Sequence, residues 1–578
     1  MSVVQATFAA TLVDEWVRAG VRDAVVCPGS RSTPLALALS RREELRVHVR
    51  LDERGAGFFA LGIAAASGRP VVVCVTSGTA AAELHPAVVE AHHSRVPLVV
   101  CTADRPPELH GVGAPQTIEQ RGLYGEAVRW AADPGVPDEL GAWSWRSLGA
   151  RAVAEAQHSP MGPGPVHLNL AFREPLVGVP GPLPEGRADG APAHRVHVHG
   201  AVVDRWSWPG ARGVLVAGAG CGPPDRVIAL AEYLGWPLLA DPRSRCRLTH
   251  DHVIAAADAI ARHGPATLRP EVVVQLGSPW ASKALPAFLA GAEVLAVDPW
   301  WRWDDPGRRI ARIHRADPAA WLEAALEVPA PRRSPGWIEA WQDAERVTQK
   351  AMDESLGDTE LSEPLVARSL LGEIGGTTTV VVSSSMPVRD VEWFAPARPD
   401  PPKVLANRGA NGIDGICSTA LGAAAASDAP VVALVGDLAF FHDLSSLVHG
   451  APGTVTGAGA GTATGTSDLG ASCTLVVVDN HGGGIFEFLP HAGLLEEAEF
   501  ERLFGTPQRP DVVRAAVGLG IRALEARTPR ELDQAVRAGT GAPGVTVVHV
   551  RVPSRKENVA LHDRVHAAVG AALSELGM

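Results

Sequence analysis

Short apolar segments without polar interruption alternate with helix-like stretches through most of this chain. In its first part, PVVVCVT (70–76) and PLVVCTA (97–103) lie on either side of AAAELHPAVVEAHHS, in which apolar residues recur every three or four positions. Strands that are apolar on both faces are typical of parallel sheets covered by helices on both sides. The alternation therefore predicts an α/β fold built from doubly wound parallel sheets.

This alternation is interrupted at two segments rich in Pro and Gly, residues 177–193 and 328–336. A chain of 578 residues is also too long to fold around one hydrophobic core. We therefore expect three α/β domains, at residues 1–180, 195–335 and 345–578.

Two segments of the chain are rich in glycine, residues 218–222 and 452–472. GAGCG (218–222) follows a predicted strand of the middle domain, but the full G-x-G-x-x-G fingerprint is absent, so we do not expect a bound dinucleotide. The segment PGTVTGAGAGTATGTSDLGAS (452–472) is too poor in large apolar residues to offset the entropy cost of ordering it. We expect a flexible surface insertion there.

Composition and charge exclude several classes of protein. A formal net charge of −12 argues against an extended nucleic-acid interface, which requires a basic surface. The seven cysteines are dispersed without a CxxC pair, so we expect neither a zinc site nor a disulfide framework. The N-terminus has no signal-like segment, and no apolar run reaches the ~18 residues of a membrane span. We expect a soluble, cytoplasmic protein.

Two predicted neighbouring strands of the third domain end in polar residues. VALVG is followed by Asp437, and LVVVD by Asn480, with three glycines at 482–484. Ligands of open α/β sheets bind at the carboxyl ends of the strands, so both side chains are expected in one site, which the glycines allow a ligand to approach. Carboxylate and amide oxygens suit Mg²⁺ that also binds phosphate oxygens. The pattern predicts a magnesium–diphosphate site.

This pattern resembles the cofactor signature of thiamine-diphosphate enzymes. The resemblance implies that thiamine diphosphate is bound through Mg²⁺ (or Mn²⁺), held by the side chains of Asp437 and Asn480 and by the carbonyl of Gly482. Asp437 and Asn480 are 43 positions apart, which is more than is usual for these enzymes. The excess is close to the size of the 452–472 insertion, which accounts for the departure.

The segment HVRLDERGAGF (48–58) resembles the catalytic-glutamate segment of the same enzymes. The resemblance places Glu53 against N1′ of the cofactor's aminopyrimidine ring. It also implies that Glu53 of one subunit faces the diphosphate domain of another, and hence a homodimer or a homotetramer. Without the resemblance, Glu53 could be an ordinary acid in the first turn of a helix, where the helix dipole favours negative charge.

Eight segments narrow the resemblance to one family within these enzymes: CPGSRSTP (27–34), LDERGAGFFALG (51–62), TSGTAAAELHPAVVEA (76–91), TADRPPEL (102–109), SSSMPVRD (383–390), NRGANGIDG (407–415), VGDL (435–438) and HGGGIFEFLP (481–490). Together they are similar to the 2-succinyl-5-enolpyruvyl-6-hydroxy-3-cyclohexene-1-carboxylate (SEPHCHC) synthases of menaquinone (vitamin K2) biosynthesis. The resemblance implies a transferase that decarboxylates 2-oxoglutarate and adds the succinyl carbanion equivalent to isochorismate, giving SEPHCHC and CO2.

The resemblance also implies the residues of the active site. Both substrates are dianions, and arginine is suited to bidentate carboxylate binding. Residues expected to act in catalysis are Glu53, Arg31, Arg105, Gln116, Lys283, Arg389 and Arg408. The substrate site is expected to contain the same residues except Glu53, together with Ser30, Ser385, Ile485 and Phe486. The cofactor site is expected to contain Glu53, Ser385, Met386, Ile413 (as the apolar wedge under a bent thiamine), Gly436, Asp437, Leu438, Asn480, Gly482, Gly484, Ile485 and Phe486.

Two positions depart from the family pattern, and two other functions remain open. His481 and Pro115 stand where we expect asparagines, which puts one polar substrate contact in doubt. Another thiamine-diphosphate enzyme, such as an acetohydroxyacid synthase or a 2-oxo-acid decarboxylase, would share the fold, but the arginines favour a substrate with several carboxylates. A catalytically inactive scaffold is the second alternative, and the presence of Glu53, Asp437 and Asn480 argues against it.

Overall fold

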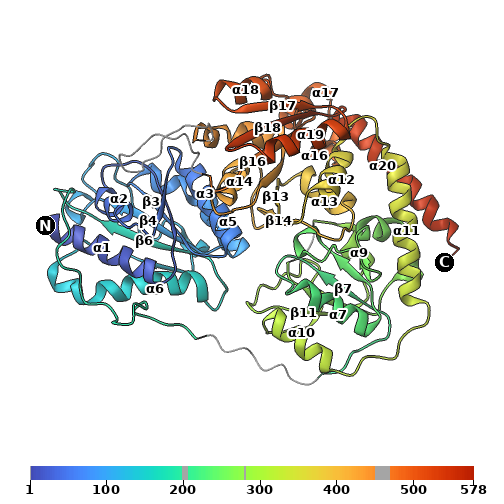
Figure 1. The fold of residues 1–578 in the computed structure, drawn as a ribbon, viewed down its shortest axis with the longest axis horizontal. Helices are drawn as coiled ribbons and strands as arrows, with labels where there is room; N and C mark the ends of the chain where they lie inside the picture. Colours follow the sequence, from blue (N-terminus) through green and yellow to red (C-terminus); the bar gives the residue numbers. More distant parts are fainter. Residues whose placement is uncertain (1, 198–205, 279–280, 450–468, 578) are drawn as a thin grey trace.

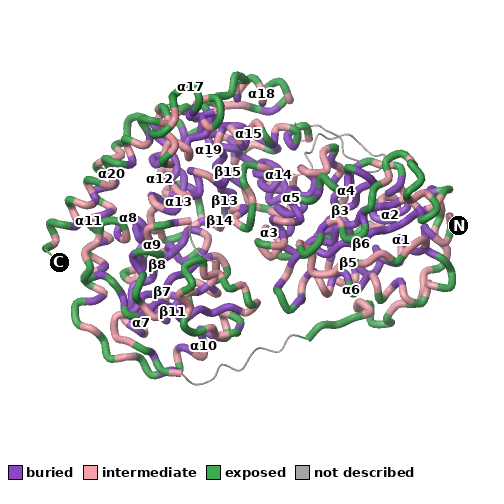
Figure 2. Tube along the Cα trace, turned by 180° about the vertical axis from the view of Figure 1, so that it is seen from behind, coloured by how far each residue is buried: buried purple, intermediate pink, exposed green. Residues whose placement is uncertain are grey.

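Three six-stranded parallel sheets, one in each part of the chain, organise the computed structural model (Figure 1). The structure describes residues 2–197, 206–278, 281–449 and 469–577. The expected α/β fold with doubly wound parallel sheets is confirmed, and the buried strands lie at the centre of each unit (Figure 2). The insertion expected at 452–472 lies, up to residue 468, outside the described residues.

The first sheet is formed by residues 23–171. Its strands are β1 (Asp23–Val26), β2 (Arg46–Val49), β3 (Val71–Val75), β4 (Leu98–Asp104), β5 (Trp130–Ala132) and β6 (Pro165–Ala171). Its helices are α1 (Ser2–Arg18), α2 (Thr33–Ser40), α3 (Glu53–Ser67), α4 (Thr79–Glu83), α5 (His85–Ser94) and α6 (Trp145–His158). Alternate residues of β3 belong to two different hydrophobic cores, Val71 and Val73 to one and Val72 to the other, which explains why this strand is apolar on both faces.

The third sheet repeats the topology of the first. The strand order is β2-β1-β3-β4-β6-β5 in the first sheet and β14-β13-β15-β16-β18-β17 in the third. The third-sheet strands are β13 (Thr379–Val382), β14 (Lys403–Ala406), β15 (Val431–Gly436), β16 (Cys473–Asp479), β17 (Arg522–Ala526) and β18 (Val545–Arg551). Its helices are α12 (Glu363–Glu373), α13 (Met386–Phe394), α14 (Ile416–Ala425), α15 (Asp437–His442), α16 (Gly484–Glu487), α17 (Glu497–Phe500), α18 (Val512–Gly518), α19 (Pro529–Thr540) and α20 (Arg555–Glu575).

The middle sheet has the strand order of dinucleotide-binding folds, β12-β11-β10-β7-β8-β9. Its strands are β7 (Gly213–Ala217), β8 (Leu238–Ala240), β9 (Val253–Ile254), β10 (Val272–Leu276), β11 (Glu293–Val297) and β12 (Ile310–His314), and its helices are α7 (Pro224–Leu234), α8 (Ala257–His263), α9 (Ala284–Phe288) and α10 (Pro318–Glu327). The Ser278 N–H, after β10, donates to the Ala219 carbonyl, after β7, at 2.9 Å. This bond connects the loop after β7 with the loop after β10. In folds with this strand order, a dinucleotide binds between these two loops.

The first and third units share one hydrophobic core where α3 packs against α14 (Figure 1). A Cβ on Gly62 of α3 would lie 2.1 Å from the Thr419 carbonyl oxygen, and one on Gly422 of α14 would lie 2.0 Å from the Phe59 carbonyl oxygen. Only glycine permits helix backbones to approach this closely. The close packing fixes α3, which begins at Glu53, against the sheet that carries Asp437.

Two long helices from later in the chain pack against the middle unit. Helix α11 (Trp337–Leu356) connects the middle and third units, and it packs against α20 at the C-terminus. Trp337 and Trp341 of α11 and Val565 of α20 belong to the hydrophobic core of the middle sheet. The middle unit is therefore anchored to the third by shared apolar packing.

Candidate active site

Asp437 lies where β15 ends and α15 begins, at the carboxyl edge of the third sheet. Its side chain is buried, and its Oδ1 accepts a hydrogen bond from the Leu438 N–H at 2.8 Å. Burial, together with repulsion from Asp479 and Glu363, raises the pKa of Asp437 to about 7. An acid that is both buried and surrounded by other acids is stabilised in its charged form by a cation.

Asn480 follows β16, the strand that pairs with β15. Its Nδ2 donates a hydrogen bond to Oε1 of Glu363 at 2.7 Å. This contact orients the amide, since the carbonyl oxygen Oδ1 must then point the other way. That oxygen is buried and has no hydrogen-bond partner among the described residues. A buried acceptor is costly when it is unpaired, so Asn480 Oδ1 is available for a ligand.

Gly482 completes this corner of the site. Its φ angle is +129°, and a Cβ there would lie 1.9 Å from the Gly505 carbonyl oxygen, so the turn excludes any side chain. Its backbone N–H lowers the pKa of Asp437 by hydrogen bonding, which places it beside that carboxylate. The structure therefore brings Asp437, Asn480 and Gly482 together. The unpartnered Asn480 oxygen and the buried Asp437 carboxylate have the chemistry of a hard divalent cation site.

The other residues predicted for the cofactor, apart from Glu53, lie at the ends of strands β13 to β16, in the following loops or at the starts of helices, at the same edge of the third sheet. Ser385 and Met386 follow β13, Ile413 lies in the loop after β14, and Ile485 and Phe486 belong to α16, after β16. Ser385 has a positive φ of 71° and precedes α13. Gly436 and Leu438 flank Asp437, and Gly484 begins α16. Parallel strands place all these loops on one side, as a single ligand site requires.

Glu53 is the first residue of α3, at the carboxyl edge of the first sheet. Asp52 caps the helix by accepting a hydrogen bond from the Gly55 N–H at 3.2 Å. Glu53 is half-buried, and burial raises its pKa, with further repulsion from Asp52 and Glu83. The next residue, Arg54, donates to the His442 carbonyl at 2.9 Å and so connects α3 to α15. A carboxyl group with a raised pKa holds a proton more readily than an ordinary glutamate, which suits a general acid.

Arg31, Arg105 and Gln116 gather above the first sheet. Arg31 is buried, and burial followed by repulsion from Arg105 lowers its pKa. Ser77 connects the other two: its Oγ accepts from Arg105 Nη1 at 3.0 Å, and its carbonyl oxygen accepts from Gln116 Nε2 at 3.0 Å. Ser30 is exposed in the same loop as Arg31. Ser77 was not predicted as a site residue, although it lies within the TSGTAAAELHPAVVEA segment.

A second group of cations lies between the third and middle units. Burial, then repulsion from Arg243 and Arg389, lowers the pKa of Arg408. Arg389 donates to the Ser385 carbonyl. Arg243, which the sequence did not single out, forms a bidentate pair with Asp241, with distances of 3.0 and 2.8 Å. Lys283 is exposed just before α9. The predicted arginines are thus placed in two groups on different units.

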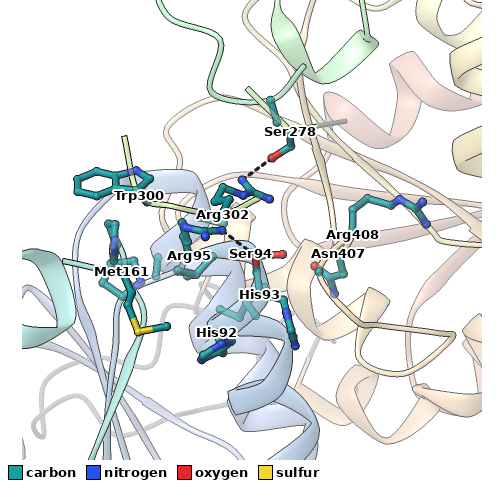
Figure 3. A pocket seen from close by; sticks show the side chains of 18 of the residues that line it. His92, His93, Ser94, Arg95, Met161, Ser278, Trp300, Arg302, Asn407 and Arg408 are labelled. Carbon is teal, nitrogen blue, oxygen red and sulfur yellow. Dashed lines mark hydrogen bonds between the residues drawn. The ribbon is translucent and has the colours of Figure 1, made fainter. Parts of the chain in front are cut away.

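A basic cavity of about 1290 Å³ opens between the three units (Figure 3). Arg302 donates from Nη1 to Ser278 Oγ at 2.6 Å, and burial followed by repulsion from Arg302 lowers the pKa of Arg95 to about 10. Among its described lining residues, Arg408 is the one predicted site residue. Other side chains that line it are His92, His93, Met161, Trp300 and Asn407.

The two departures from the family pattern both lie on exposed loops. The His481 side chain is 69% exposed, and its Nδ1 lies 3.6 Å from Asp479 Oδ1. Pro115 is exposed, and its carbonyl oxygen accepts from Arg105 Nη2 at 3.3 Å. Pro115 therefore contacts a predicted substrate residue through its backbone. Within the described ranges, the structure contains no helix with the length and hydrophobicity needed to cross a membrane.

Two parts of the chain match known families of thiamine-diphosphate enzymes. Residues 6–123 match the family described as thiamine pyrophosphate enzyme, N-terminal TPP binding domain, and residues 193–375 match the middle domain of thiamine pyrophosphate enzymes. Together with three parallel sheets, these matches define the chain as a thiamine-diphosphate enzyme. The chain is 41% identical to the SEPHCHC synthase of Myxococcus xanthus over 98% of both chains. It is also 39% and 38% identical to the synthases of Geobacillus kaustophilus and Bacillus velezensis, over 97% of each chain. The chain belongs to the SEPHCHC synthase family.

Proposed function

We propose that this enzyme decarboxylates 2-oxoglutarate and adds the succinyl unit to isochorismate, releasing CO2 and forming SEPHCHC for menaquinone biosynthesis. The observation that carries the proposal is the similarity to SEPHCHC synthases over nearly the whole chain. The two groups of arginines support it, because each substrate carries two carboxylates and arginine binds carboxylates through a planar fork.

Bound thiamine diphosphate would supply the electron sink for decarboxylation. In this proposal residues 345–578 bind the diphosphate through a divalent cation, Mg²⁺ or Mn²⁺, which Asp437 and Asn480 hold by their side chains and Gly482 by its backbone carbonyl. Residues 1–180 bind the pyrimidine, where the Glu53 carboxyl group exchanges a proton with N1′. Residues 195–335 form the central domain.

The proposed assembly is a homodimer at minimum, with each active site completed by a second copy of the chain. Apolar side chains are exposed at both halves of the proposed site: Leu51, two residues before Glu53, is 62% exposed, and Ile413 is 36% exposed. Contact with a cofactor or a partner would remove this apolar surface from water, which is favourable. Glu53 of one subunit would then face the metal site of the other.

The proposal is tested by an assay with purified protein, thiamine diphosphate, Mg²⁺, 2-oxoglutarate and isochorismate. We expect isochorismate absorbance to fall only when all components are present. Pyruvate in place of 2-oxoglutarate is the control for a different 2-oxo-acid enzyme. Full activity with pyruvate and none with 2-oxoglutarate would contradict the substrate assignment.

Replacing Arg105 or Arg408 by alanine is expected to raise a substrate KM. A charge-assisted hydrogen bond to a carboxylate contributes about 1.5–3 kcal/mol, so KM should rise roughly 10- to 100-fold. Steady-state kinetics for each substrate would show which carboxylate each arginine binds. Arg151→Ala is the matched control, because Arg151 pairs with Glu155 on the exposed surface of α6. Unchanged KM values for both substrates in both variants would contradict the proposed roles.

A further inference from the structure

Glu90, near the end of α5 in the first unit, contacts the loop between β14 and α14 of the third unit. Its side chain is buried, with 1% of its surface exposed. Oε1 accepts hydrogen bonds from the Gly409 N–H at 2.9 Å and from the Ser94 hydroxyl. Oε2 accepts from the N–H groups of Ala410 and Asn411 at 2.6 and 2.8 Å. One carboxylate therefore binds three successive backbone N–H groups of another domain.

Successive backbone N–H groups that converge on one point form an anion-binding concavity. Here the anion belongs to the protein itself, and hydrogen bonds to a carboxylate are stronger than those between neutral groups. Gly409 also packs tightly against α5, since a Cβ there would lie 2.7 Å from the Cβ of His93. The loop is thus held from its buried side by one residue of the first unit.

The opposite side of this loop is open to solvent. Gly409, Ala410, Gly412 and Ile413 are exposed, so the loop buries little apolar surface of its own. Its other anchors are polar contacts: Ser384 Oγ donates to the Asn407 and Asn411 carbonyls at 3.2 and 3.3 Å. A segment with so few apolar contacts depends on its hydrogen bonds for a defined conformation.

We infer that Glu90 is a positioning residue that sets the conformation of residues 408–413, and through them the placement of Arg408 and Ile413. This inference rests on the proposed function, in which Arg408 binds a substrate carboxylate and Ile413 supports the cofactor. Glu90 itself touches neither substrate nor cofactor in this account. It links the active-site loop of the third unit to the first unit, which carries Glu53.

Hydrogen–deuterium exchange of the cofactor-free protein tests the contact without using activity. In the wild type, the amides of residues 409–411 should exchange slowly although Gly409 and Ala410 are exposed. In Glu90→Gln, which loses the charge and one acceptor oxygen, we expect exchange at these amides to be about tenfold faster or more, because the amides lose the acceptor that protects them. Fast exchange in the wild type, or the same slow exchange in Glu90→Gln, would overturn the inference.

Kinetics then separate positioning from a general effect on the domain interface. In Glu90→Gln we expect the KM for a substrate and the Kd of thiamine diphosphate to rise about fivefold or more, as lost preorganisation weakens binding. Glu90→Asp keeps the charge but is one methylene shorter, so it should be intermediate. The control is Lys403→Met, which removes another contact between these units, from Lys403 Nζ to the Ala66 carbonyl at 2.8 Å, and should change neither constant.

The exchange and kinetic results together separate the positioning role of Glu90 from the proposed function. Faster exchange in Glu90→Gln with unchanged KM and Kd would overturn the positioning role, as would equal effects in Lys403→Met. If Glu90→Gln does not fold, Glu90→Asp and the wild-type exchange rates still decide the question. A wild-type protein that does not consume isochorismate would refute the proposed function, whereas the exchange data would still report on the Glu90 contact.

Discussion

Replacing Glu53 by glutamine should lower kcat by about 100- to 10,000-fold, the usual contribution of a positioned acid or base. Glutamine has nearly the same shape but cannot exchange a proton. Thiamine diphosphate binding, measured by calorimetry, should change little, because the proposed metal ligands lie on another unit. Burial is the first cause of the raised pKa of Glu53, and a carboxyl group that holds a proton more readily is consistent with the proposed role in proton exchange.

Glu83→Gln is the matched control for this variant. Glu83 is exposed on α4 and raises the pKa of Glu53 by repulsion, but it has no place in the proposed chemistry. It should keep most of the turnover. Wild-type kcat in Glu53→Gln would refute the catalytic role, and equal losses in both variants would indicate a general disturbance of the first unit.

Replacing Asp437 by asparagine should remove most of the Mg²⁺-dependent affinity for thiamine diphosphate. Loss of one partner from a buried charged pair costs about 2–5 kcal/mol, so Kd should rise roughly 30-fold or more. The cofactor-free variant should be at least as stable as the wild type, because a neutral amide is easier to bury beside Asp479 and Glu363 than a carboxylate is. Mg²⁺ and thiamine diphosphate together should raise the Tm of the wild type and not that of the variant.

Asp443→Asn provides the comparison. Asp443 is equally buried and accepts hydrogen bonds from the Ser418 N–H at 2.7 Å and the Ser418 hydroxyl at 3.1 Å. Replacing Asp443 should lower the Tm of the cofactor-free protein. The Tm should still rise when Mg²⁺ and thiamine diphosphate are added. Undiminished Mg²⁺-dependent binding by Asp437→Asn would remove Asp437 from the metal site.

Most central strands could be predicted from the sequence, and edge strands mostly could not. β3 and β15 are continuously apolar because both of their faces are buried. β2 (RVHV) and β17 (RALEA) lie at sheet edges, where polar residues interrupt the pattern. β6 lacks the continuously apolar pattern for another reason: it is central, but its His167 and Asn169 are buried and bonded to Thr102. No local pattern reveals such a long-range polar pairing.

The residues of the candidate site could likewise be predicted only in part from the sequence. Asp437, Asn480 and the glycines could be predicted because they directly follow recognisable strands. Glu363 orients Asn480 from 117 positions away, and in the sequence it belongs to an ordinary helix start after Ser362. Arg243, in the middle unit, likewise lowers the pKa of Arg408 in the third. Glu90, in the first unit, accepts hydrogen bonds from backbone N–H groups of residues 409–411 in the third. Their partners are chosen by the packing of the domains, which local sequence does not encode.

The most direct test of the proposed reaction is its stoichiometry. With 2-oxoglutarate labelled at C1, the purified enzyme with thiamine diphosphate and Mg²⁺ should release one labelled CO2 for each isochorismate consumed. The product mass should equal the sum of isochorismate and 2-oxoglutarate less CO2. Glu53→Gln should show neither change. Release of CO2 that does not depend on isochorismate and leaves it unchanged would contradict the proposal and identify a simple decarboxylase.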